Sequence, residues 1–446
     1  MGDPHAAGGL PVNAAADALR RAGQRYLGRE LDRARFAHWT GQWYPGWIVA
    51  DRQREKLAAI VAHARARSRF YRERLAGLPE ELDLGAYARV PFLTREEVLF
   101  HAAAIRCGGG WASRSSGGSS GTGVRIPVDA EAYAWYLAGT WLGLRWSGTD
   151  FTQRGAVLLG PRPGGLVGVA SRVKDWVMNW IRIPVEPGFD GRATRVVERL
   201  RTLEPAYLYA YPSAAQRLAR AVLEGRAAAP SGLKVVVFTG EPVYSFQRRE
   251  VEEAFGCPVA VEYGSGEVGC VAFTCPAGTP HLMAENVYVE VAEDPRLPAG
   301  GWILVTQLHN RLFPLLRYRI GDVGLVREPT CPCGRALPEL QVLGRGWDLL
   351  VADGEARFVH PLLDRLFEQL PDRLLGRVRL RHPAPGEATV EVDSHTDADV
   401  SRVRDLTADL LGPGWRVRAA RAMFRRLPSG KCAYFVADGT GTVPDE

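Results

Sequence analysis

The amino-acid sequence predicts an α/β protein, with a large N-terminal domain of mixed and parallel sheets flanked by helices and a small, mobile α+β C-terminal domain. In the middle of the chain, short apolar strands alternate with helices, the pattern of a parallel sheet. Around Gly344–Asp348 the chain changes to short, charge-rich segments, as expected at a hinge. A length of 446 residues is also too great for one ordinary core. We therefore place the domains at residues 1–345 and 346–446.

The strand–helix alternation is clearest in the middle of the chain. Strands are expected at Ala206–Ala210, Lys234–Phe238 and Val259–Glu262, and helices at Ser213–Leu223, with Ser213 as the cap, and Phe246–Phe255. Ligands bind beyond the carboxyl ends of parallel strands. Those ends carry Tyr211, Thr239-Gly240-Glu241 and Tyr263-Gly264-Ser265-Gly266-Glu267. We expect a binding site there.

The outer segments give further elements. Thr94, with Glu97 three residues later, indicates the start of a helix. The periodicity predicts helices at Arg52–Leu75 and Val400–Leu411, and strands at Val124–Val128, Val287–Val291, Trp302–Gln307, Val378–Leu380 and Thr389–Val392.

The composition excludes several classes of protein. No apolar run is long enough to cross a bilayer, and the first residues lack the pattern of a signal peptide, so we expect a cytoplasmic protein without a membrane partner. A net charge of +6 without a long basic run does not indicate nucleic-acid binding. Seven cysteines without a regular framework argue against a secreted disulfide fold. We expect a monomer or homodimer.

Arg114–Val124 is a run of glycines and small hydroxyl residues between a helical region and a strand, which predicts the tip of a hairpin. Glycine lets backbone N–H groups turn inward around an anion, and hydroxyls add donors. No Gly-Lys-Ser/Thr follows at the Walker spacing, and a flexible linker is an equal interpretation of the loop alone. The candidate phosphate ligands are Ser115, Ser116, Gly117, Gly118, Ser119, Ser120, Gly121, Thr122 and Gly123.

Five motifs in order resemble the acyl-adenylate-forming superfamily, and most of all its phenylacetate–coenzyme A ligase branch with the capsule- and antibiotic-pathway relatives. They are this loop, Tyr-Gly-x-x-Glu at 263–267, Arg-Tyr-x-x-Gly-Asp at 317–322, Gly-Arg-x-x-Asp at 344–348 and Pro-x-Gly-Lys at 428–431. Cys-Pro-Cys-Gly-Arg at 331–335 suits the same branch. The resemblance spans roughly Leu57 to Lys431. It implies that the protein uses ATP to convert a carboxylic acid into an acyl-AMP, and that the acyl group then passes to coenzyme A.

The resemblance also implies roles for individual residues. Lys431 would be the catalytic lysine and Glu267 the Mg²⁺ ligand, and the glycine- and serine-rich loop would hold the β,γ-phosphates. Residues implied at the AMP moiety are Gly240, Glu241, Tyr263, Gly264, Ser265, Asp322 as the ribose ligand, and Arg345. Lysine is scarce, with only Lys56, Lys174, Lys234 and Lys431, which favours a specific role for Lys431.

Two positions depart from the family pattern. Gly266 stands where the family has Thr, although Ser265 could substitute, and Trp347 stands at the hinge carboxylate position, followed by Asp348. Amide formation with an amine is therefore the alternative to transfer to coenzyme A. A nucleotide-binding scaffold without catalysis is a second alternative, opposed by the presence of Lys431, Glu267 and Asp322 together.

A metal site and an acyl pocket complete the expectations. Three thiolates and an imidazole would suit tetrahedral zinc, and some members of this branch carry such a site. The ligands would be Cys275, His281, Cys331 and Cys333, with Cys270 as a substitute, leaving Cys107, Cys257 and Cys432 as plain thiols. For an aromatic acid, the candidate pocket residues are Tyr136, Trp141 and Tyr211, although core packing explains such aromatics equally well.

Overall fold

The computed structural model describes residues 28–81, 83–109, 112–115, 124–161 and 164–438. Its main sheet has eleven strands in the order β10-β11-β12-β13-β9-β8-β7-β6-β5-β3-β4. The parallel strands are β3 (Gly155–Leu158), β4 (Trp180–Arg182), β5 (Tyr207–Ala210), β6 (Val235–Phe238) and β7 (Val259–Ser265). The antiparallel strands are β8 (Gly269–Thr274), β9 (Pro280–Leu282), β10 (Val287–Glu293), β11 (Gly301–Gln307), β12 (Tyr318–Arg327) and β13 (Glu339–Arg345).

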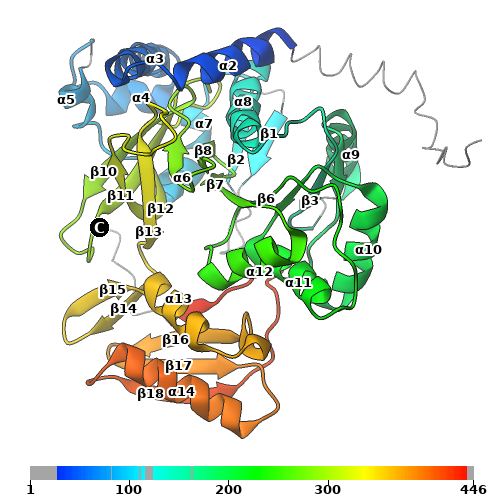
Figure 1. Cartoon of the computed structure of the whole chain (residues 1–446). Helices are drawn as coiled ribbons and strands as arrows, with labels where there is room; N and C mark the ends of the chain where they lie inside the picture. Colours follow the sequence, from blue (N-terminus) through cyan, green and yellow to red (C-terminus); the bar gives the residue numbers. More distant parts are fainter. Residues whose placement is uncertain (1–27, 82, 110–111, 116–123, 162–163, 439–446) are drawn as a thin grey trace, which may run out of the picture.

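Helices cover the parallel strands, because the strand residues are apolar on both faces. The helices α10 (Ala193–Leu203), α11 (Pro212–Leu223) and α12 (Ser245–Phe255) share one buried core with these strands (Figure 1). The long helix α8 (Ala130–Trp146) belongs to a second core with β8 and the N-terminal helices α2 (Gly28–Gly41) and α3 (Gly46–Arg67). Such burial on both faces is typical of parallel strands.

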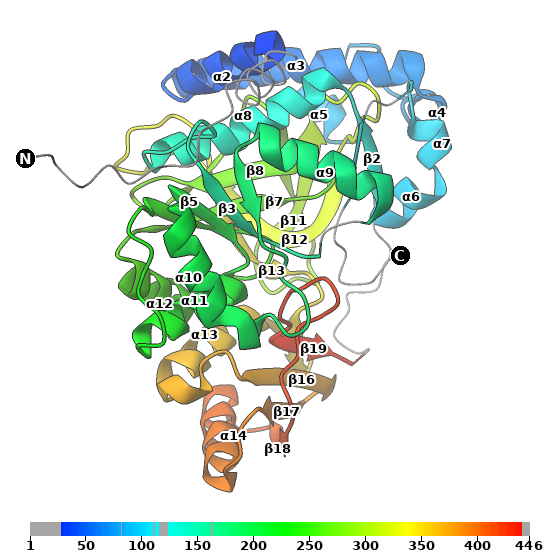
Figure 2. The same ribbon diagram turned by 90° about the vertical axis from the view of Figure 1, so that its right-hand side faces the viewer.

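The chain after Arg345 forms separate small sheets below the main sheet (Figures 1 and 2). The strands β14 (Leu349–Ala352) and β15 (Glu355–Phe358) pair with each other, and β16 (Val378–Ala384), β17 (Glu387–Val392), β18 (Arg416–Arg421) and β19 (Phe435–Ala437) form a second sheet. The helices α13 (Val359–Gln369) and α14 (Asp397–Leu411) pack on it around one apolar core. We refer to the residues up to Arg345 as the large part and to those after it as the small part.

The predicted fold class is confirmed, with two local corrections. The helix expected at Arg52–Leu75 is split, because Ser68 ends α3 and its hydroxyl caps α4 (Arg69–Arg74) by accepting from the Tyr71 N–H at 3.3 Å. Ser213 is not the cap of α11, since Tyr211 occupies that position and Pro212 opens the helix. The predicted cap at Thr94 is confirmed, as part of a capping box with Glu97.

The length and apolarity of a helix decide whether it can cross a bilayer. Across the part of the chain that the structure describes, no helix combines the length and the apolarity that a membrane span needs.

Candidate active site

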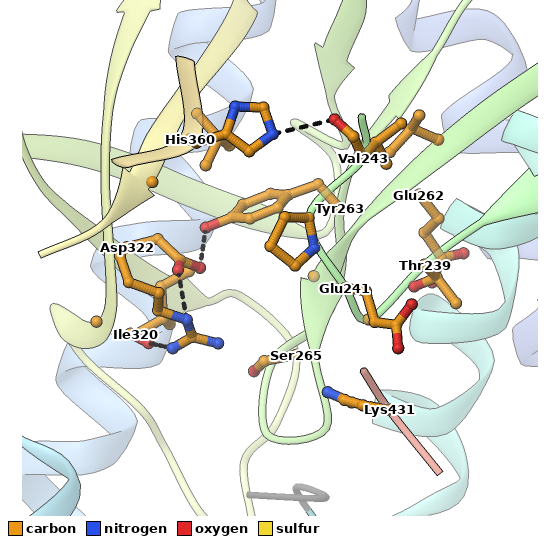
Figure 3. Close-up of a pocket in the computed structure, with 18 of the residues that line it drawn as sticks. Thr239, Glu241, Val243, Glu262, Tyr263, Ser265, Ile320, Asp322, His360 and Lys431 are labelled. Carbon is orange, nitrogen blue, oxygen red and sulfur yellow. Dashed lines mark hydrogen bonds and ion pairs between the residues drawn. The ribbon is translucent and has the colours of Figure 1, made fainter. Parts of the chain in front are cut away.

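A cleft of about 1500 Å³ lies between the carboxyl ends of the parallel strands and the small part (Figure 3). It brings together residues that the sequence places far apart. Of the predicted site residues, the following line it: Tyr136, Tyr211, Gly240, Glu241, Tyr263, Gly264, Ser265, Glu267, Asp322, Arg345 and Lys431.

Asp322 receives two hydrogen-bonding groups from opposite sides. The Tyr263 hydroxyl donates to Asp322 Oδ2 at 2.8 Å, and Arg345 Nε lies 3.0 Å from Oδ1. Burial, together with the Asp322 charge, holds the pKa of Tyr263 well above its ordinary value, so the phenol keeps its proton. Each carboxylate oxygen retains a lone pair for a further donor, such as a vicinal hydroxyl of a ribose.

Trp347 covers the turn that leads to Asp322. Gly321 has a φ of +88°, and a Cβ at that position would lie 2.4 Å from the Trp347 ring. The Arg345 guanidinium lies 5.3 Å from the centre of the same ring. An indole therefore packs where the sequence pattern predicts a hinge carboxylate, and burial raises the pKa of the following Asp348 to about 6.

Glu267 is presented by the tight connection between β7 and β8. Its side chain is buried, and Oε1 lies 3.4 Å from Arg95 Nη1. Gly264 permits this turn, because a Cβ there would lie 1.9 Å from the Gly269 carbonyl oxygen. The Ser265 hydroxyl accepts from the Val268 N–H at 3.3 Å, which leaves its own proton available to a ligand.

Lys431 enters the cleft from the loop before β19. Its Nζ lies 5.7 Å from the centre of the Tyr211 ring, and Figure 3 shows it on the same side of the cleft as Glu241. Burial lowers the pKa of Lys431, while the charges of Glu241 and Asp322 oppose that shift. A desolvated ammonium is thus held close to the groups predicted to contact the nucleotide.

Arg426, which sequence analysis missed, anchors this loop. Its buried guanidinium donates to Asp190 Oδ1 at 2.7 and 3.0 Å, to the Ser213 hydroxyl at 2.8 Å and to the Gly430 carbonyl at 3.0 Å. The signal was weak, because the arginine is one of many in an arginine-rich chain. Glu241 likewise has a task that the sequence did not indicate, since its carboxylate accepts from the Ser213 and Cys432 N–H groups.

The predicted acyl-pocket residues separate in the structure. Tyr136 and Tyr211 line the cleft, whereas Trp141 does not. The Trp141 ring packs 6.2 Å from Trp39 and 5.4 Å from the Arg35 guanidinium, on the side of α8 that meets α2. Trp141 therefore follows the core-packing alternative, on a different face of α8 from the cleft.

Several known proteins are similar to parts of this sequence. No protein-family profile matches the chain. It is 29% identical over 184 residues to a phenylacetate-coenzyme A ligase of Thermus thermophilus, covering 39% of this chain and 40% of that protein. A phenylacetate-coenzyme A ligase of Escherichia coli is 27% identical over 199 residues, or 42% of this chain and 45% of that protein. The indoleacetate–lysine synthetase of Pseudomonas savastanoi is 39% identical over 94 residues, or 20% and 22%. The chain thus matches less than half of the length of each of these relatives.

Among solved structures, a 2-hydroxyisobutyryl-CoA ligase in the postadenylation state superposes with a TM-score of 0.72 at 20% identity, over 89% of this chain and 91% of that chain. The chain thus shares its fold with this acyl-CoA ligase, in line with the resemblance seen in the sequence motifs. The same ligase in the thioesterification state gives a TM-score of 0.57 at similar coverage.

A second cluster of polar side chains lies outside the cleft. One ligand atom from each of Cys275, His281, Cys331 and Cys333 lies within 4.8 Å of the others. His281 Nδ1 lies 2.9 Å from the Leu337 carbonyl oxygen, which fixes the proton on Nδ1 and leaves Nε2 facing Cys333 Sγ at 3.3 Å. This donor set fits a tetrahedral zinc ion.

The remaining cysteines lie apart from this cluster. Cys270, the predicted substitute ligand, is not among the grouped donors, because it is buried against Gly139 of α8. Cys257 is buried in the core beneath α12, and Cys107 and Cys432 are half-buried. Cys432 also lines the cleft.

The glycine- and serine-rich loop can be placed only by its flanks. Ser116–Gly123 lies outside the described residues. The flanking strands β1 (Ala112–Ser115) and β2 (Arg125–Val128) pair antiparallel, with Ser115 opposite Arg125. The loop therefore connects the two strands of a hairpin, as the sequence predicts.

Proposed function

We propose that the protein uses ATP to convert a carboxylic acid into an acyl-AMP, with release of pyrophosphate, and then transfers the acyl group to coenzyme A. One observation carries this proposal: Lys431, Asp322 and Glu267 come from distant parts of the sequence and line one cleft. Acid activation brings an anionic carboxylate to an anionic phosphate, so it needs a cation between them. Lys431 supplies that cation.

The other residues take roles that match their surroundings. Asp322 binds the ribose hydroxyls with its remaining lone pairs, and Tyr263 and Arg345 hold its carboxylate in place. Glu267, which lies 3.4 Å from Arg95, would hold a Mg²⁺ ion, and that ion would neutralise phosphate charge. The loop Ser115–Gly123 holds the β,γ-phosphates, and Ser265 supplies the hydroxyl that Gly266 lacks.

An aromatic acid is the proposed substrate. Tyr136 and Tyr211 line the cleft, and the Tyr211 ring lies beside Lys431, where the acid has to lie. Three relatives point the same way, since their names specify phenylacetate or indoleacetate. Phenylacetate and indoleacetate are therefore the first acids to test.

Amide formation is the second candidate for the transfer step. The indoleacetate–lysine synthetase is named for joining an acid to an amine. Trp347 at the hinge is a further reason to keep this candidate, because a packed indole replaces the expected carboxylate. A scaffold without catalysis is disfavoured by the joint presence of Lys431, Glu267 and Asp322 in the cleft.

Two further features belong to the proposal. The cluster of Cys275, His281, Cys331 and Cys333 would hold a structural zinc ion, and the domain boundary falls after residue 345, where the main sheet ends. ATP and coenzyme A as substrates fit a cytoplasmic enzyme.

The test is acid-dependent exchange of labelled pyrophosphate into ATP over a panel of aromatic and aliphatic acids. Exchange with at least one acid is expected, and the product formed with coenzyme A or with amines is then identified by mass. Absence of exchange throughout the panel, in protein that binds ATP, would favour the scaffold instead.

A further inference from the structure

The loop that carries Lys431 is held to the large part by a continuous hydrogen-bond network. Ser213 lies at its centre: its hydroxyl donates to Glu241 Oε1 at 2.9 Å and accepts from Arg426 Nη1 at 2.8 Å. Arg426 also reaches Asp190, and Glu241 also accepts from the Cys432 N–H at 2.7 Å. We call this network of Asp190, Ser213, Glu241, Arg426 and the Cys432 N–H the Ser213 bridge.

The bridge holds both sides of Lys431. Arg426 binds the Gly430 carbonyl immediately before the lysine, and Glu241 binds the Cys432 N–H immediately after it. Asp190, Ser213 and Glu241 all belong to the large part, whereas Arg426 and the loop belong to the small part. The position of the Lys431 ammonium in the cleft is therefore set by contacts between the two parts.

Close packing at two glycines keeps the loop in this position. A Cβ at Gly430 would lie 2.1 Å from the Val185 carbonyl oxygen, and one at Gly160 would lie 2.6 Å from the Ser429 carbonyl oxygen. Gly430 also has a φ of +84°. At these two glycines the loop therefore cannot shift without moving its neighbours.

Arg426 is the least replaceable member of the bridge. Its side chain is 2% exposed, and its guanidinium contacts Asp190, the hydroxyl and carbonyl of Ser213, and the Gly430 carbonyl of the loop. Burial raises the pKa of Glu241, and the charge of Arg426 opposes that shift. Without Arg426 the Ser213 and Gly430 acceptors would lose this buried donor, which is unfavourable.

We propose that Arg426 is a positioning residue that places Lys431 for acid activation and contributes little to acyl transfer. The inference rests on the proposed function. Activation requires the ammonium between two anions that repel each other, whereas the acyl-AMP has already joined them. Loss of the bridge therefore slows formation of the acyl-AMP far more than its use.

The two half-reactions can be measured separately. Arg426→Met should lower acid-dependent pyrophosphate exchange by about 100-fold, comparable to loss of a preorganised catalytic donor. Transfer from supplied acyl-AMP to the acceptor should stay within about 3-fold of the wild type. Arg426→Lys keeps the positive charge but loses the planar guanidinium with its several N–H donors, so it should give an intermediate rate of pyrophosphate exchange. Arg425→Met is the matched control, because this exposed neighbour contacts Met423 rather than the bridge.

Amide hydrogen exchange supplies a readout that needs no substrate. In Arg426→Met the peptide containing Cys432 should exchange its amide hydrogens at least about 10-fold faster, because the loop loses the bond from Arg426 to the Gly430 carbonyl and separates more often from the Glu241 carboxylate that accepts from the Cys432 N–H. Arg425→Met should match the wild type. Equal losses of rate in acid activation and in acyl transfer, or an unchanged rate of amide hydrogen exchange at Cys432, would overturn the inference. If the wild type exchanges no pyrophosphate with any acid, the proposed function fails, and the Cys432 result still decides whether Arg426 holds the loop.

Discussion

Arg345 stands directly opposite Asp322 in the pairing of β12 with β13, and its Nε lies 3.0 Å from the Asp322 carboxylate. The register of the sheet thus fixes the orientation of the acid that is proposed to bind ribose. Tyr263, which lies in β7, donates a hydrogen bond to the other carboxylate oxygen of Asp322. An acid held from both sides presents its remaining lone pairs in one direction.

Asp322→Asn should weaken ATP binding. The amide keeps the size of the carboxylate, but it offers one acceptor oxygen instead of two and repels the Arg345 donors. We expect KM for ATP to rise by at least about 10-fold in pyrophosphate exchange, with a smaller change in KM for the acid. Tyr263→Phe should have a milder effect in the same direction. An unchanged KM for ATP in Asp322→Asn would rule out the ribose role.

Lys431→Ala should abolish activation while leaving the fold and ATP binding largely intact. The ammonium is half-buried and makes no hydrogen bond that would be left broken within the described residues. Its removal should lower the exchange rate by at least about 100-fold. Lys234→Ala is the control, because the exposed side chain of that lysine contacts only the Gly148 carbonyl among the described hydrogen bonds. A normal rate of pyrophosphate exchange in Lys431→Ala would show that Lys431 takes no part in acid activation.

The cysteine and histidine cluster should bind about one zinc ion per chain. Elemental analysis of protein purified without chelator checks the stoichiometry. Cys333→Ser should reduce the zinc content and the Tm, whereas Cys257→Ser, in a separate core, should keep the zinc content. Zinc well below one per chain in the wild type would contradict the proposal.

Asp348 should make stability depend on pH. Burial raises its pKa from 3.8 to about 6, so the folded protein binds its proton more tightly than the unfolded chain. The resulting stabilisation is present below pH 3.8 and is lost as the pH rises through about 6. Asp348→Asn mimics the neutral acid, so it should raise the Tm more at pH 8 than at pH 5. A Tm gain that is equal at both pH values would show that ionisation of Asp348 is not the cause.

Sequence reasoning succeeded where local pattern decides structure. Apolar strands with helices between them fixed the parallel sheet, and its carboxyl edge collected Tyr211, Glu241 and Tyr263 as expected. The Thr94 cap was equally local, since the hydroxyl and its partner lie three residues apart.

Sequence reasoning failed where a side chain acts across a long separation. Arg426 reaches Asp190 and Ser213, more than two hundred residues away, and nothing near Arg426 in the chain indicates these partners. Ser213 had a plausible local role as a helix cap, yet the structure uses its hydroxyl for Glu241 and Arg426. Trp141 shares its helix with Tyr136 but faces α2, because helix period alone does not say which face meets the cleft.

The strand β13 has a mechanical consequence for the whole molecule. It begins at Glu339, which pairs with His281 and accepts from the Cys331 N–H at 2.7 Å, and it ends at Arg345 beside Asp322. Seven residues of extended chain, about 20 Å, thus connect the cysteine and histidine cluster directly to the cleft. We therefore expect that a change which disorders the Cys275, His281, Cys331 and Cys333 cluster also displaces Arg345 and weakens the proposed binding of nucleotide at Asp322.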